Sequence, residues 1–66
     1  MWTSAIGTNA GLLWRLLSEQ GPQTLAGLKK RSKLNDRELY LALGWLTREG
    51  KIRYAREKAA IRVSLR

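Results

Sequence analysis

Residues 35–56 read NDRELYLALGWLTREGKIRYAR, and the spacing of the apolar residues changes within this stretch. Asn35 and Glu38 stand three positions apart, as the two partners of a helix capping box do, and Gly50 is typical of a helix end. Between them, leucines recur at the spacing of one helix face. The stretch therefore predicts a helix over about residues 36–49. Its inward stripe consists of Leu39, Leu43 and Leu46.

Beyond Gly50 the apolar residues alternate with basic ones, as they do in a strand with one buried face. Residues 51–56 and 60–65 both follow this alternation. They predict a two-stranded hairpin over about residues 51–65, with a short basic tip between the strands. The side chains expected on its inner face are Ile52, Tyr54, Ile61, Val63 and Leu65.

Two further helices are predicted upstream of this stretch. Residues 6–20 carry apolar side chains at helical spacing. Pro22 marks the end of this predicted helix, because proline cannot continue the helical hydrogen bonds. Thr24 is a suitable N-cap for a shorter helix over residues 25–32. The order helix, helix, helix, hairpin predicts one α+β domain over residues 1–66 with the winged helix-turn-helix fold.

The net charge of +8 is distributed unevenly along the 66 residues. Residues 1–28 contain one basic and one acidic side chain, Arg15 and Glu19, so the whole net charge belongs to residues 29–66. A basic half next to a neutral half is typical of a surface that meets polyanions, and nucleic acid is the first candidate. The alternative is a charge that serves only solubility.

Several function classes are excluded by the residue types that the sequence lacks. Cysteine and histidine do not occur, which removes disulfides, thiolate and imidazole metal ligands, and Ser–His or Cys–His nucleophile pairs. Two of the five acidic residues, Asp36 and Glu38, are explained by helix capping. We expect no enzyme, no catalytic residue, no metal or other cofactor and no small-molecule ligand.

The apolar clusters of the sequence are short. The longest are interrupted by Arg15 and fall far short of the roughly 20 apolar residues of a membrane span. The first residues also lack the basic start and long apolar run of a secretory signal. The sequence therefore predicts a cytoplasmic protein without a membrane partner.

Residues spread over nearly the whole chain form a pattern similar to that of a known protein family. It comprises Ile6, Gly7, Asn9, Ala10, Gly11, Trp14, Leu28, Lys29, Lys30, residues 39–46 and residues 48–52. With these residues the chain resembles a family of small bacterial winged helix-turn-helix proteins of unknown function, over about residues 6–65. The resemblance implies a winged-helix fold and, for some relatives, a homodimer. It implies no characterised activity, because DNA binding in that family is inferred from the fold.

The face of the 36–49 helix opposite its leucines is the predicted recognition surface. Arg37 and Arg48 suit phosphate contact or guanine reading, whereas Leu41 and Gly44 offer no hydrogen bond to a base. This favours contact with the DNA backbone over base reading. Tyr40 and Trp45 flank this stripe. We expect Trp45 to be partly buried against the hairpin or the first helix, and Tyr40 either to contact phosphate or to pack.

Two basic clusters complete this surface, one before the 36–49 helix and one on the hairpin. Together they predict a DNA-binding protein that contacts duplex DNA mainly by charge and regulates transcription. The alternative is a protein–protein interaction module, with Leu41, Gly44 and Trp45 in an apolar docking face. The predicted DNA-binding residues are Lys29, Lys30, Lys33, Arg37, Tyr40, Leu41, Gly44, Arg48, Arg56 and Lys58.

The first helix carries a second apolar side and two small residues one turn apart. A chain of 66 residues without cysteine has a thin core, and oligomerisation is the support that remains available. Small residues at this spacing let another helix approach closely, within the domain or across a dimer. We therefore expect a homodimer. Its predicted interface consists of Trp2, Gly7, Gly11, Leu12 and Leu16.

Overall fold

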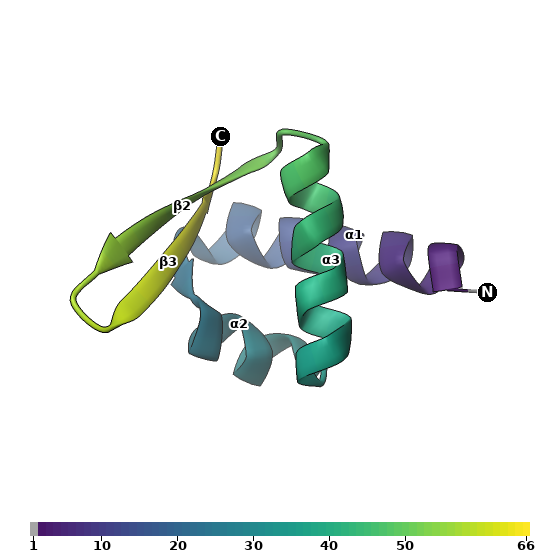
Figure 1. The fold of residues 1–66 in the computed structure, drawn as a ribbon, viewed down its shortest axis with the longest axis horizontal. Coiled ribbons are helices and arrows are strands. Elements are labelled where there is room, and N and C mark those ends of the chain that lie inside the picture. Colours follow the sequence, from purple (N-terminus) through teal and green to yellow (C-terminus); the bar gives the residue numbers. More distant parts are fainter. Residues whose placement is uncertain (1) are drawn as a thin grey trace.

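Three helices precede a β-hairpin, as the sequence predicts (Figure 1). The computed structural model describes the backbone of residues 2–66 and the side chains of residues 4–66. The elements are α1 (Trp2–Gln20), β1 (Gln23–Thr24), α2 (Leu25–Ser32), α3 (Asp36–Arg48), β2 (Ile52–Glu57) and β3 (Ala60–Leu65). The α+β winged helix-turn-helix prediction is therefore confirmed.

Helix α1 begins at Trp2, four residues before the predicted start at Ile6. The prediction was wrong at this end because the apolar stripe that marks the helix starts only at Ile6. The extra turn continues through Ser4 and Ala5, neither of which is a strong helix breaker. In Figure 1 this end of α1 extends past α3.

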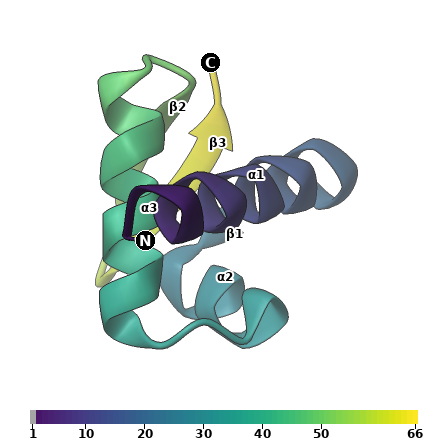
Figure 2. The same ribbon diagram turned by 90° about the vertical axis from the view of Figure 1, so that its right-hand side faces the viewer.

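The core lies where the three helices meet the sheet. The largest side chains that are almost completely shielded from water come from α1, α2, α3 and β3: Leu13, Leu28, Leu39 and Val63. The inward stripe predicted for α3 is confirmed, because its three leucines are all buried. Figure 2 shows α1 and α2 on the same side of α3, so the other side of α3 has no covering element.

The sheet has three antiparallel strands in the order β1-β3-β2, rather than the two strands predicted. The third strand is the two-residue β1, in which Gln23 pairs with Val63 and Thr24 pairs with Arg62. A strand of two residues has no alternation that a sequence pattern could reveal. Thr24 also caps α2 as predicted, because its hydroxyl accepts a hydrogen bond from the Gly27 N–H at 3.0 Å.

The hairpin extends beyond the core, so only part of its inner face is covered (Figure 1). Ile52 and Val63 are buried and Leu65 is half-buried, as expected. Tyr54 and Ile61 were also predicted on the covered face, but they are 45% and 41% exposed. The alternation of apolar residues identified the correct face of each strand. It carried no information on how far along the strands the helices cover that face.

Candidate nucleic-acid interface

A tight turn connects α2 to α3 and determines the angle between them. Lys33 adopts a left-handed conformation with φ of 62°, and its N–H donates to the Lys29 carbonyl at 3.0 Å. The Leu34 N–H then donates to the hydroxyl of buried Ser32 at 3.3 Å. Both bonds satisfy backbone groups at the end of α2, where the helix itself supplies no partner. The turn therefore holds Lys33 at the surface, directly before α3.

The predicted capping box is present at the start of α3. The Glu38 N–H donates to Asn35 Oδ1 at 2.8 Å, and the Asn35 N–H donates to Glu38 Oε1 at 3.1 Å. These reciprocal bonds fix the first turn of the helix. Glu38 is thereby occupied in a local structural role, as its position in the sequence indicates.

An ion pair joins α2 to the first turn of α3. Lys29 Nζ lies 2.8 Å from Asp36 Oδ1, and both side chains are at least half exposed. The hydrogen bond to Asp36 and the charge of its carboxylate raise the pKa of Lys29 above its ordinary value. Lys29 is thus already paired, unlike Lys30 and Lys33, which form no ion pair with any residue that the structure describes.

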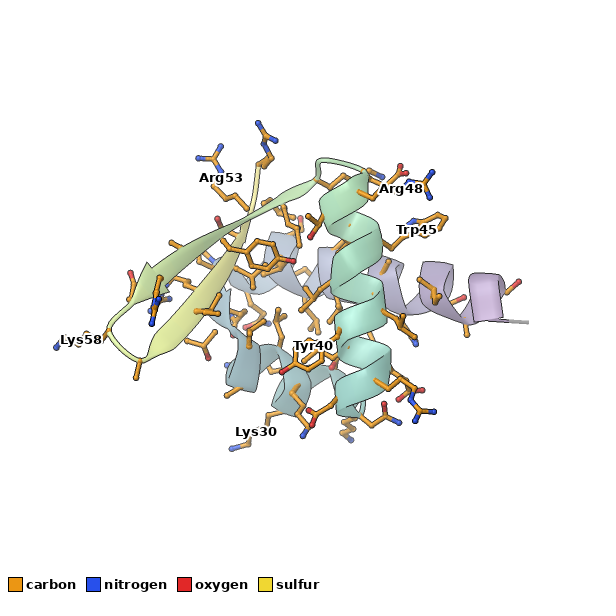
Figure 3. The ribbon with its side chains drawn as sticks, in the orientation of Figure 1. Lys30, Tyr40, Trp45, Arg48, Arg53 and Lys58 are labelled. Carbon is orange, nitrogen blue, oxygen red and sulfur yellow. The ribbon has the colours of Figure 1, made fainter. Side chains whose placement is uncertain are left out.

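The uncovered side of α3 carries Arg37, Tyr40, Gly44 and Arg48, which we call the recognition face. All four are exposed, and Tyr40 is the most exposed large hydrophobic side chain described, at 56%. Figure 3 shows Tyr40 on the hairpin side of α3 and Arg48 on the other side, near the end of the helix. A Cβ added at Gly44 would meet no atom within 4 Å, so nothing blocks access to the helix backbone there.

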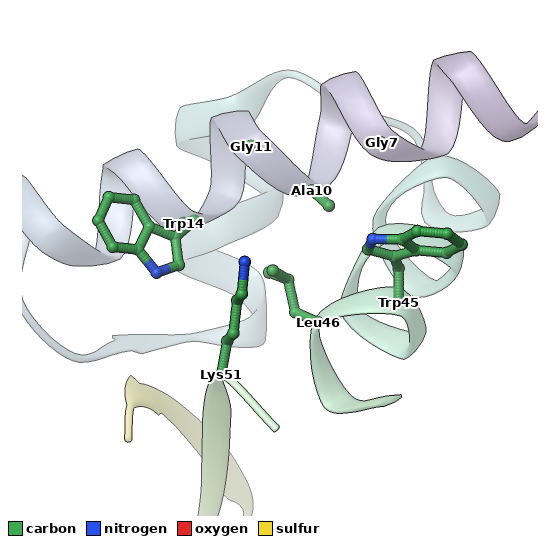
Figure 4. A pocket seen from close by; sticks show the side chains of 7 residues that line it. All are labelled: Gly7, Ala10, Gly11, Trp14, Trp45, Leu46 and Lys51. Carbon is green, nitrogen blue, oxygen red and sulfur yellow. The ribbon is translucent and has the colours of Figure 1, made fainter. Parts of the chain in front are cut away.

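Leu41 and Trp45 lie on the flank of α3 that faces α1. Leu41 lines a hollow together with Ile6 and Arg37. Trp45 borders a separate groove between α1 and α3, with Trp14 across from it (Figure 4). We call this second hollow the aromatic groove. Trp45 was expected to be partly buried against the hairpin or the first helix, but it borders this open groove and, at 36%, is an exposed large hydrophobic side chain.

A pair of hydroxyl groups attaches the hairpin to α3. The Thr47 hydroxyl donates to the Leu43 carbonyl at 2.7 Å, and Thr47 Oγ1 lies 2.6 Å from the Tyr54 hydroxyl oxygen. Because Thr47 has one hydroxyl proton and uses it for Leu43, the Tyr54 hydroxyl is the donor in the second bond. Sequence reasoning missed this contact, since seven residues and a change of element separate its partners.

The basic side chains of the hairpin differ in their surroundings. Arg56 shares a strand face with Tyr54, and Lys58 occupies the tip with φ of 54°. Figure 3 shows Lys58 at the end of the hairpin farthest from α3, and Arg53 near the start of β2. Arg62 is paired, because its Nε donates to Glu57 Oε1 at 2.8 Å. Arg53 is a further exposed cation of the hairpin that the prediction did not include, on the strand face opposite to that of Tyr54 and Arg56.

The sequence matches the family described as Winged helix-turn-helix domain (DUF2582) over residues 1–65. The chain belongs to this family. Neither a curated protein nor a solved structure matches it. Along the described part of this DUF2582 chain, none of the helices combines the length and apolarity needed to cross a bilayer.

The residues predicted for a dimer interface do not form one face of this winged helix-turn-helix domain. Gly7 and Gly11 line the aromatic groove, whereas Leu16 lines a different hollow beside Gly27. Leu12 is half-buried. Trp2 begins α1, but its side chain lies outside the described residues. Within the described part of the chain, no other helix packs onto the two glycines, because an added Cβ at either would meet no atom within 4 Å.

Proposed function

We propose that this winged helix-turn-helix domain binds duplex DNA, chiefly through the phosphate backbone, and acts as a cytoplasmic transcriptional regulator. The observation that carries the proposal is the arrangement of cations around the recognition face. In Figure 3, Lys30 of α2, Arg48 of α3 and Lys58 of the hairpin lie around Tyr40 on three sides. Positive charge contributed by three different elements suits a polyanion that is longer than any single element.

The shape of α3 supports the same proposal. An α-helix with its side chains is about 10–12 Å across and the major groove of B-DNA is about 12 Å wide, so a helix with one uncovered side can enter it. On α3 that side contains Gly44, where the lack of a side chain allows close approach. The hairpin is tied to α3 by the Tyr54–Thr47 bond, which would hold Arg56 beside the DNA that α3 contacts.

The chemistry of the recognition face favours backbone contact over base reading. Arg37 and Arg48 are its only side chains that can donate two hydrogen bonds to one guanine. Tyr40 can donate one hydrogen bond to a phosphate, and Gly44 offers none. We expect modest sequence preference and a strong dependence of affinity on salt.

The test is the salt dependence of binding to a fluorescently labelled duplex, measured by anisotropy. Arg37→Ala and Arg48→Ala should each weaken binding and reduce the slope of log affinity against log salt by about one unit, because each variant neutralises one phosphate fewer. The matched control is Arg15→Ala, which removes the same charge from an exposed position on α1. Its slope should equal that of the unmodified protein.

Two outcomes would contradict the proposal. One is the absence of binding to any duplex at low salt. The other is an Arg15→Ala variant that loses as much affinity as the two α3 variants, since the charge would then act without a defined surface. Either result would favour the protein–protein interaction module, in which Leu41→Asp would abolish partner capture and the arginine variants would have little effect.

We also propose a homodimer, because two copies would present two recognition helices to a palindromic site. The small core supports self-association in general, and Leu12 and Leu16, one helical turn apart on α1, are only half-buried. Sedimentation equilibrium tests this directly. A dimer is expected at micromolar concentration, and a monomer at hundreds of micromolar would contradict the proposal.

A further inference from the structure

The aromatic groove is separate from the recognition face and has a different chemistry. It lies between α1 and α3, has a volume of about 370 Å³, and ends at Lys51, just before β2 (Figure 4). Ala10 and Leu46, each 3% exposed, belong to the core and form its floor. This volume is near the lower end of the range for small-molecule sites, roughly 300–1,000 Å³.

Two tryptophans border the groove, and both are unusually accessible. Trp14 of α1 is 44% exposed and Trp45 of α3 is 36% exposed. Indole rings have large apolar faces that bind other flat rings by offset stacking or edge-to-face contact. In Figure 4 the two indoles stand on opposite sides of the groove, with the floor between them. A flat aromatic molecule in the groove would lie beside apolar indole surface.

The groove exists because α1 has glycines at two positions along its edge. A Cβ at Gly7 or Gly11 would meet no atom within 4 Å, so these glycines do not serve close packing inside the domain. Glycine inside a helix is unfavourable relative to alanine. Their effect here is to keep the space beside Ala10 open. A larger side chain at Gly11 would occupy this space.

Among the residues whose side chains are described, Lys51 is the only charged one that lines the groove. Figure 4 shows its ammonium group directed into the groove, between Trp14 and Trp45. Both ion pairs among the described residues involve other side chains, so Lys51 forms no ion pair with a described carboxylate. An anionic group on a ligand would find a cation beside an apolar surface, where charge attraction is stronger than in open water.

We propose that the aromatic groove binds a small aromatic carboxylate, with its ring against Trp14 and Trp45 and its carboxylate at the Lys51 ammonium. This proposal departs from the expectation, drawn from the sequence, that the protein takes no small-molecule ligand. It does not depend on DNA binding, since none of its lining residues belongs to the recognition face.

Titration with 2-naphthoate, followed by the indole and backbone N–H signals in two-dimensional NMR, tests this proposal. 2-Naphthamide serves as the neutral probe of the same shape, and acetate as the carboxylate without a ring. We expect saturable shifts of the Trp14 and Trp45 indole signals with 2-naphthoate at about millimolar concentration. Binding of 2-naphthamide should be about three- to tenfold weaker, because it lacks the charge-assisted contact with Lys51. Acetate alone should produce no saturable shift.

Two variants separate the parts of the site. Lys51→Gln should remove the preference for 2-naphthoate over 2-naphthamide, whereas Lys58→Gln removes the same charge at the hairpin tip and should leave the preference unchanged. Gly11→Leu should fill the groove and abolish binding of both ring probes. Because leucine favours a helix more than glycine does, this variant should melt no lower than the unmodified protein, which separates a filled groove from an unfolded domain.

The proposal is overturned if neither indole signal responds to 2-naphthoate. It is also overturned if Lys51→Gln retains the preference, or if Gly11→Leu still binds. A shift of both indole signals with protein concentration, without any probe, would show that a second copy of the chain occupies the groove instead.

Discussion

The recognition face and the aromatic groove lie on the same helix, α3, but they are built in opposite ways. The recognition face is a convex surface with charge at its edges, and the elements beside it are fixed by the capping box, the Lys29–Asp36 pair and the Tyr54–Thr47 bond. The aromatic groove is concave and mainly apolar, with one cation. A convex charged surface suits a long polyanion, whereas a concave apolar one suits a small ligand. The two proposed kinds of binding on one short helix follow from the different neighbours of its flanks.

The largest expected effect comes from removing the core that both regions share. Leu43 is 3% exposed in the centre of α3. Leu43→Ala should lower the free energy of unfolding by about 2–5 kcal/mol, because it leaves a cavity beneath the helix. Urea denaturation followed by circular dichroism measures this loss. Binding of DNA and of 2-naphthoate should decline together as the folded fraction falls. Loss of only one of them would show that the two regions do not depend on the same core.

A smaller effect should follow from detaching the hairpin from α3. Tyr54→Phe removes the bond to Thr47 but leaves the Thr47–Leu43 bond intact, so no buried group loses its partner. The free energy of unfolding should fall by about 0.5 kcal/mol, the lower end for a hydrogen bond, because this bond is open to water. Duplex affinity should decrease while 2-naphthoate binding stays unchanged.

Tyr40→Phe is the matched control for stability, since its hydroxyl has no hydrogen-bond partner among the described residues. If Tyr40→Phe and Tyr54→Phe lower the free energy of unfolding equally, the Tyr54–Thr47 bond does not hold the hairpin. If Tyr54→Phe impairs the groove more than duplex binding, the separation of the two regions is wrong.

The smallest effect concerns Lys29, which is paired with Asp36 at 2.8 Å. Asp36→Asn should free this lysine for a phosphate and steepen the salt dependence of duplex binding by up to about one unit. Glu19→Gln removes an acidic group from α1 and should leave the slope unchanged. Because the pKa of Lys29 is raised in the folded protein, the pair stabilises the fold at neutral pH and is lost as the pH rises through that raised pKa. An unchanged slope for Asp36→Asn would place Lys29 outside the DNA contact.

Local patterns in the sequence were sufficient for most of the fold. The Asn35–Glu38 box, the α3 leucines and the N-cap Thr24 all depend on residues within one or two turns of each other. The pairing of β1 with β3 and the exposure of Tyr54 depend instead on where distant elements lie. No spacing rule contains that information.

The candidate sites were predictable to different degrees. The exposed arginines of α3 follow directly from the position of the leucine stripe. The aromatic groove brings together residues from α1, α3 and the start of β2, and the sequence indicated only a small-residue spacing at Gly7 and Gly11. That spacing was interpreted as a packing surface, within the domain or across a dimer; in the folded domain the glycines border open space, so packing within the domain is not what they serve, and the dimer stays a prediction. The basic cluster that contains Lys29 was predicted, whereas the ion pair between Lys29 and Asp36 was not.

The two-residue strand β1 also affects the order in which the chain assembles. Its pairing of Gln23 with Val63 closes a loop of 40 residues, whereas the β2–β3 hairpin and the α2–α3 turn close over short distances. Closing a long loop costs more chain entropy, and contacts between distant residues slow folding. The α2–α3 unit and the hairpin should therefore form early, and β1 should join them last. Because β1 contributes only two paired residues, β1 should detach from β3 in local openings that cost less than global unfolding, whereas buried Ile52 and Val63 keep the hairpin against the helices.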